Sequence, residues 1–234
     1  METQITNIKS IRISYMENYS DYIVDYSDYN IIPIGDHCAI SLVLKDLNLR
    51  KQSYPFDWVT RNDQIHDTNI MYNIQIIREL TSSDNVDYIV QKYIGNAFDN
   101  NKLNSANHII FPHDTENVAD IFEKYKRRFL RLKLDLHKKN IFILLTRHYY
   151  IEMDVFQKIV EELLSYNRDS IVLFISGTNH AYFENMECSH VIFKYIEYDI
   201  SKHYEYDYST FRPNIKIFLS DLLLTYPRVL PEEE

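Results

Sequence analysis

The sequence predicts an α/β fold with a mainly parallel central sheet flanked by helices, and three observations favour this class. Residues 141–146 and 171–176 form short, continuously apolar runs, which are typical of strands buried on both faces. A helical pattern at 152–166 separates these runs and supplies the crossover that a parallel pair requires. A β-branched run up to Gly35, followed by another helical pattern, indicates a further strand and helix of the same kind.

The elements of the first half follow in order. Residues 1–30 contain a near-repeat of Tyr-Ser-Asp-Tyr, which predicts a solvated edge strand or an extended arm. After the strand that ends at Gly35, we expect a helix over about residues 36–47 and a turn at 52–55. The apolar residues of the next expected helix recur at helical spacing: Ile70, Ile74, Ile77 and Leu80.

In the second half, residues 95–107 are rich in Asn and Asp and predict a long loop. The clearest helical stripe of the chain follows this loop and consists of Phe122, Tyr125, Phe129, Leu132 and Leu136. After the strand, helix, strand unit, we expect one more strand at 191–196 and a closing helix around 215–222.

The length of 234 residues and the hydrophobic content of 45% favour one compact domain with a substantial core. We expect a single α/β domain over residues 31–226, preceded by the arm at 1–30. Residues 227–234 end in an acidic run and predict a flexible tail.

Charge and composition exclude several classes of partner. A formal net charge of −9 and a pI near 5.5 argue against nucleic acid and anionic membrane surfaces, which require clustered Lys and Arg. We therefore expect a small-molecule or peptide substrate, and the oligomeric state stays open. No apolar run approaches the ~20 residues of a membrane span, and the amino terminus lacks a leader pattern.

The two cysteines lie far apart in sequence, at Cys38 and Cys188, so a disulfide framework is not expected. This cysteine usage favours a reducing compartment. We therefore expect a cytoplasmic location, or the host cytoplasm if the source is viral.

Cys38 is the leading candidate nucleophile. It lies just after Gly35, in the first turn of the expected helix, where free N–H groups and the helix dipole favour the thiolate. Asp36 is a candidate cap, and His37 is adjacent but diverges by about 100° on a helix. The alternative interpretation of Cys38 is a small buried hydrophobic residue.

The candidate base is a histidine at the end of the Asn-rich region. His108 and His113 frame this segment, and His113 is preferred because Asp114 follows it. Asp114 either orients that imidazole or caps the next helix.

Metal and cofactor sites are not expected. The sequence has no His-x-x-x-His pair and no Cys-x-x-Cys motif. The segment Gly-Thr-Asn-His at 177–180 lacks the glycine spacing of a phosphate-binding loop. His148 and His180 follow expected strands, and we retain them as candidate binding residues because parallel strands present their carboxyl ends to ligands.

The basic residues of the expected helix around 122–136 predict a solvated outer face, since the surrounding chain is acidic. Arg128 and Arg131 are nevertheless candidates for contact with an anionic ligand.

Several of these residues fall into an ordered signature. The patterns are Gly-x-x-Cys at 35–38, Leu-Arg at 49–50, Ser-x-Pro-Phe-Asp-Trp at 53–58 and Lys-Arg-Arg-Phe-x-Arg-Leu at 126–132. This order resembles the signature of a family described as putative papain-like cysteine peptidases, found in bacteria and large DNA viruses. The matching patterns and the strand after them span roughly residues 31–146.

The resemblance implies that Cys38 is the nucleophile and that a histidine of the 108–113 region is the base. Thiolate attack on an acyl carbon would give a thioester, which water then hydrolyses. Asp57 and Trp58 belong to the most distinctive tetrapeptide. Asp57 either orients the base or binds an internal N–H, and Trp58 is a binding or a core residue.

Two alternatives stay open. The family resemblance implies a papain-like α+β scaffold, which contains an antiparallel barrel. The order of strands and helices after residue 140 instead favours a parallel α/β domain. A parallel sheet is also compatible with a noncatalytic module that binds a sugar or nucleotide at the same edge.

Overall fold

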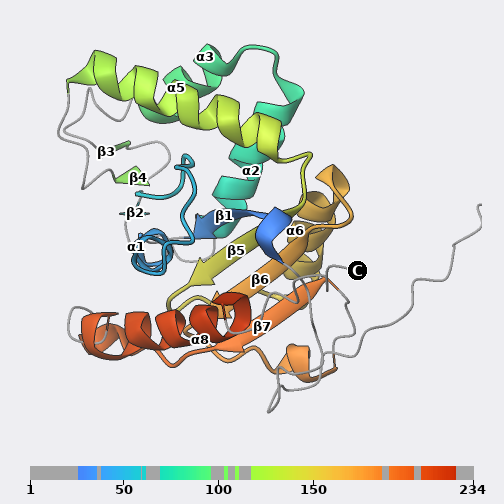
Figure 1. The fold of residues 1–234 in the computed structure, drawn as a ribbon. Coiled ribbons are helices and arrows are strands. Elements are labelled where there is room, and N and C mark those ends of the chain that lie inside the picture. The colour runs from blue at the N-terminus through green and yellow to red at the C-terminus, as the bar shows by residue number, and fades with distance from the viewer. Residues whose placement is uncertain are drawn as a thin grey trace, which may run out of the picture.

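A computed structural model gives the fold of the chain (Figure 1). It describes residues 26–35, 38–58, 60–61, 69–95, 103–104, 109–110, 117–185, 190–202 and 207–224. The expected amino-terminal arm, apart from residues 26–30, and the expected acidic tail lie outside the described residues.

The centre of the fold is a four-stranded sheet in the order β1-β5-β6-β7, and each neighbouring pair is parallel. Its strands are β1 (Asn30–Gly35), β5 (Asn140–Thr146), β6 (Ile171–Ser176) and β7 (Val191–Tyr195). The predicted α/β class with a parallel sheet is confirmed. The alternative of an antiparallel papain-like α+β fold is wrong for this central sheet.

Helices cover both faces of the sheet. The side chains of β5 alternate between the faces and so contribute to two cores. Ile141, Ile143 and Leu145 pack on one face with α1 (Ala39–Asp46) and α8 (Arg212–Leu224). Phe142 and Leu144 pack on the other face. The helices on that face are α2 (Asn69–Ser82), α3 (Val86–Val90), α5 (Val118–Asp135) and α6 (Met153–Tyr166).

The expected helices and strands are present with shifted ends. Helix α1 begins at Ala39 rather than near residue 36, because Cys38 occupies its N-cap position. Helix α3 was not expected. It has five residues, too few for a periodic signal, and the Asn85 side chain caps it by accepting a hydrogen bond from the Tyr88 N–H.

A second, antiparallel sheet has the order β2-β4-β3, with β2 (Thr60–Arg61), β3 (Leu103–Asn104) and β4 (Ile109–Ile110). Strand β3 lies inside the segment expected to be a loop. Two-residue strands produce no alternation in the sequence, so pairing with distant residues decides them.

Short helical turns complete the described chain. They are η2 (Tyr26–Asp28), η3 (Gln91–Gly95), η4 (Ala181–Asn185), η5 (Ile200–Lys202) and η6 (Asp207–Phe211). No helix among the described residues has the length and apolar character needed to cross a membrane.

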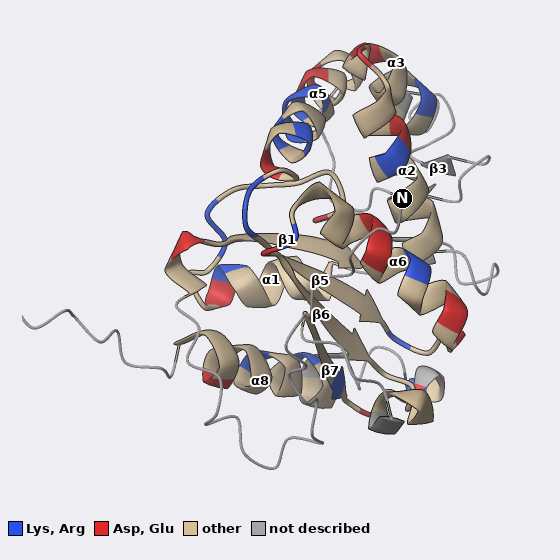
Figure 2. Cartoon of the chain, turned by 90° about the vertical axis from the view of Figure 1, so that its right-hand side faces the viewer, with Lys and Arg blue, Asp and Glu red and all other residues tan. Residues whose placement is uncertain are grey.

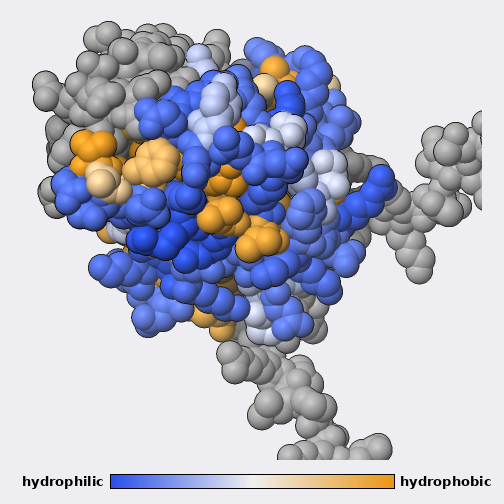
Figure 3. Space-filling model, turned by 90° about the horizontal axis from the view of Figure 1, so that it is seen from above, coloured by the Kyte–Doolittle hydropathy of each residue, from blue (hydrophilic) through white to orange (hydrophobic). Residues whose placement is uncertain are grey.

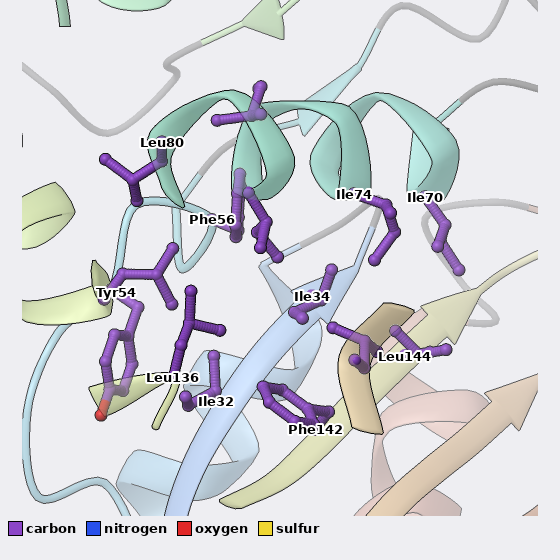
Figure 4. Close-up of a cluster of buried hydrophobic side chains, with 14 of the residues drawn as sticks. Ile32, Ile34, Tyr54, Phe56, Ile70, Ile74, Leu80, Leu136, Phe142 and Leu144 are labelled. Carbon is purple, nitrogen blue, oxygen red and sulfur yellow. The ribbon is translucent and has the colours of Figure 1, made fainter. Parts of the chain in front are cut away.

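Buried side chains of β1 and α2 belong to one core, part of which Figure 4 shows. Ile70 and Ile74 of α2 lie on the side of Ile34, near the carboxyl end of β1. Leu80, at the other end of α2, lies toward Tyr54. Helix α2 therefore runs antiparallel to β1 and brings its first turns to the strand's carboxyl end.

Helix α5 carries charges of both signs, and Figure 2 shows Lys and Arg beside Asp and Glu along it. Leu130 and Leu134 are also exposed, Leu134 by 70%. Figure 3 shows the molecule from above, where hydrophilic residues surround small hydrophobic groups.

Candidate functional site at the carboxyl edge of the parallel sheet

Cys38 lies three residues beyond the end of β1, at the N-cap of α1. It is 6% exposed, and its carbonyl accepts the first helical hydrogen bond from the Leu42 N–H at 3.1 Å. The first-turn N–H groups of an α-helix have no partner within the helix and carry its positive dipole end. Cys38 therefore lies at the start of a helix, as expected, and the reactivity of its thiol stays a prediction.

The neighbouring strands end at the same edge, because β1, β5 and β6 are parallel and in register. Thr146 closes β5 and Ser176 closes β6, and their buried hydroxyl oxygens lie 3.0 Å apart. Arg147 follows Thr146 and is only 2% exposed. The edge beyond the strands is consequently polar although it is buried.

Gly177 brings the ends of β5 and β6 into close contact. Its N–H donates to the Thr146 carbonyl at 2.8 Å. A Cβ at this position would overlap the carbonyl oxygen of Arg147 and come within 2.5 Å of the Tyr198 Cβ. Gly177 is therefore required because a Cβ has no space at this position. A positive φ is not the reason, since no described glycine has one.

His180, a candidate binding residue, is 1% exposed and bonded to backbone through both ring nitrogens. Its Nε2 accepts from the Ile151 N–H at 3.0 Å, so Nδ1 carries the proton and donates to the Thr178 carbonyl at 2.8 Å. The ring stacks on Tyr150, with centroids 4.7 Å apart. These contacts link the β5–α6 loop to the β6–η4 loop.

We expect stability to fall below neutral pH because of His180. Burial lowers the pKa of its imidazole, although the Thr178 carbonyl opposes this effect. A folded-state pKa below the unfolded value of about 6.5 makes the stabilisation complete above that pH. It is lost as pH falls through the folded pKa, where Nε2 gains a proton and can no longer accept the Ile151 bond.

Thermal denaturation at pH 7.5 and pH 5 measures this effect. His180→Gln should reduce the difference in Tm between the two values, whereas His137→Gln, at an exposed histidine of the α5–β5 connection, should keep it. An unchanged difference in the His180 variant would contradict the prediction.

His148 lies at the same edge, just after β5, and is half-buried. Its ring lies 4.0 Å from the Tyr149 ring and 6.3 Å from the Tyr198 ring, measured between centroids. His148 therefore belongs to an aromatic group that joins β5 to the segment after β7.

Asp57 is a buried residue of the turn formed by residues 50–58. Its Oδ2 accepts from Arg50 Nε at 3.1 Å, Arg50 Nη2 at 2.5 Å and the Tyr54 N–H at 3.1 Å. The Arg50 guanidinium also lies 4.8 Å from the Trp58 ring centroid. Burial raises the pKa of Asp57, and the Arg50 charge and the Tyr54 N–H oppose this rise.

This turn and Cys38 lie at opposite ends of α1. The N–H of Arg50 donates to the carbonyl of Leu44 in the last turn of α1, whereas Cys38 caps its first turn. Eight residues at a rise of ~1.5 Å separate these ends by about 12 Å. Tyr54 also donates to Asp135, which precedes β5 and lies toward the amino edge of the sheet.

Arg128 and Arg131 face this turn rather than the solvated outer face of α5. Arg131 Nη1 donates to the Ser53 carbonyl at 2.6 Å. Arg128 is 8% exposed and lies 4.9 Å from the Tyr125 ring centroid, and its charge opposes the rise that burial causes in the pKa of Asp57. The expectation of a solvated face is therefore wrong for Arg128, because its side chain is buried beside Tyr125, within electrostatic reach of Asp57.

Asn73 of α2 is a buried polar residue that was not among the candidates predicted from the sequence. Its Nδ2 donates to the Gly35 carbonyl at 3.0 Å, and the residue is 0% exposed. An Asn within the apolar stripe of Ile70, Ile74 and Ile77 was the available signal, because buried amides require a partner.

Several residues discussed in the sequence analysis lie outside the described residues, so the roles predicted for them stay predictions. They are Asp36, His37, His108, His113, Asp114 and Cys188. Within the described part of the chain, no group of three or more His, Cys, Asp or Glu is arranged to hold a metal ion.

Fold and site together define a parallel α/β protein with a buried cysteine at the start of a helix. The chain belongs to the family described as "Putative papain-like cysteine peptidase", whose family model matches residues 29–170. No curated protein matches the chain. No solved structure matches it.

Proposed function

We propose that the protein is a cysteine-dependent hydrolase, a peptidase or amidase, with Cys38 as its nucleophile. The observation that carries this proposal is the position of Cys38 at the N-cap of α1, beyond the carboxyl end of β1. The family match includes this segment and supports the peptidase class.

In the proposed reaction, His113 takes the thiol proton and the Cys38 sulfur attacks the acyl carbon. The negative charge on the acyl oxygen is stabilised by N–H groups at the start of α1. Collapse expels the amine, which takes the proton from the imidazolium, and leaves a thioester. Water then gives a proton to His113 and attacks the thioester carbon. Collapse releases the acid and expels the Cys38 thiolate, which takes the proton back from His113 and restores the free thiol.

Asp57 has no catalytic role in this proposal. Its charge is bound by Arg50 beyond the opposite end of α1 from Cys38. We propose instead that Asp57 holds the 50–58 turn together.

The test is the pH dependence of alkylation by iodoacetamide in a Cys188→Ser background. We expect Cys38 to react with an apparent pKa well below the ~8.5 of an ordinary cysteine. His113→Gln should move this profile, and His137→Gln, at an exposed position, should not. Alkylation of Cys38 no faster than that of Cys188 in a Cys38→Ser background would remove the main support.

A second candidate function is a noncatalytic module that binds a sugar or nucleotide. The buried hydroxyl pair of Thr146 and Ser176 favours it, because ligands of parallel α/β folds bind beyond the strands' carboxyl ends. Calorimetry with a panel of sugars and nucleotides separates the two functions. Binding that survives in Cys38→Ala and is lost in Thr146→Val would support the module.

A further inference from the structure

We infer that Asn73 is a positioning residue for Cys38. It acts through the carbonyl of Gly35, the last residue of β1, to fix the direction in which the chain leaves the sheet. This inference rests on the proposed function only in taking Cys38 as the reactive group.

Gly35 is the last residue of β1 that is paired with β5. Its partner in β5 is Leu145. In that sheet β1 is an edge strand with β5 as its neighbour. The Asn73 amide supplies a hydrogen bond to β1 from outside the sheet, three residues before Cys38.

Helix α2 holds Asn73 firmly in place. Ile70, Ile74 and Ile77 are all buried against the sheet, and they flank Asn73 on the same helical face. Figure 4 shows the side chains of Ile70 and Ile74 on the side of α2 that faces the strands. A rigid donor therefore meets the carbonyl that directs the chain toward the N-cap of α1.

Burying the amide of Asn73 among isoleucines costs free energy, whereas burying an apolar side chain there would not. The bond to Gly35 compensates that cost and also specifies the position of one carbonyl. Both properties fit a residue that places the thiol over the first turn of α1, where the reactivity of Cys38 depends on alignment with the N–H groups.

The experiment compares Asn73→Ala and Asn73→Leu in the Cys188→Ser background. The first removes volume and the second keeps it, and both remove the donor. We expect alkylation of Cys38 by iodoacetamide at pH 7 to slow by about tenfold and its pH profile to move toward that of an ordinary thiol.

Asn140→Ala is the matched control. Asn140 is also fully buried and donates to backbone carbonyls of Asp135, Leu136 and Lys138, but it lies at the amino end of β5. It should lower Tm without moving the alkylation profile of Cys38. Hydrogen exchange of residues 39–42 should rise in the Asn73 variants and not in this control.

An Asn73 variant that folds and keeps the wild-type alkylation profile would overturn the positioning role, even if its Tm falls. An ordinary profile in the wild-type protein would instead count against the proposed hydrolase. The two failures are therefore distinct, since one compares variants and the other concerns the parent protein.

Discussion

Replacement of Arg50 by methionine is expected to lower the free energy of unfolding by about 3 kcal/mol, because the buried carboxylate of Asp57 loses its counter-charge. The Asp57 side chain is fully buried and that of Arg50 is 16% exposed, so solvent cannot replace the lost partner. Arg50→Met also removes the contact with Trp58 and the hydrogen bond to Ser53.

Urea denaturation at pH 7 measures this loss. The control is Lys158→Met, whose partner Asp154 lies 3.5 Å away with both side chains about 70% exposed. A pair of this kind contributes at most ~0.5 kcal/mol. Equal effects of the two substitutions would show that the Arg50–Asp57 pair does not hold the turn.

A second substitution in this turn distinguishes a structural from a catalytic role of Asp57. Asp57→Asn keeps the shape and removes the charge, so it should destabilise the protein while leaving the alkylation profile of Cys38 unchanged. A stable Asp57→Asn protein with a slowed Cys38 would instead favour the catalytic role that the sequence left open.

Gly177→Ala is expected to destabilise the fold by about 3 kcal/mol, at the upper end of the usual cost of overpacking. The added Cβ meets the carbonyl oxygen of Arg147, a backbone atom that cannot rotate away. Relief requires β5 and β6 to separate at their carboxyl ends, which would strain the Thr146–Ser176 contact.

Thermal denaturation tests this prediction, with Ala181→Ser as the control because it adds one atom at an exposed position four residues later. That control should change the free energy of unfolding by less than ~0.5 kcal/mol. A Gly177→Ala protein with the wild-type Tm would show that the two strand ends are not closely packed.

Most of the fold was predictable because its elements are long and their patterns are simple. All seven residues of β5 are buried, and its run of apolar residues is the reason the strand was expected between two helices. The buried side chains of α5 at 121, 125, 129 and 132 follow helical spacing in the same way. The parallel direction then followed from the crossover helix α6.

The small elements were not predictable. Helix α3 and strands β2, β3 and β4 are too short for periodicity, so contacts with distant residues decide them. Arg128 was expected to face solvent for a related reason, because contacts with distant residues decide whether it is buried. The sequence contains no local sign that this arginine is buried within electrostatic reach of Asp57.

By itself, the sequence determined the parallel α/β class and the place of Cys38 at the start of a helix, because both depend on neighbouring residues. Only the tertiary structure brought Asn73 to the Gly35 carbonyl and Tyr54 to Asp135, pairs that lie 38 and 81 residues apart in the sequence. Long-range hydrogen bonds depend on how whole elements pack, and no spacing along the chain encodes that packing.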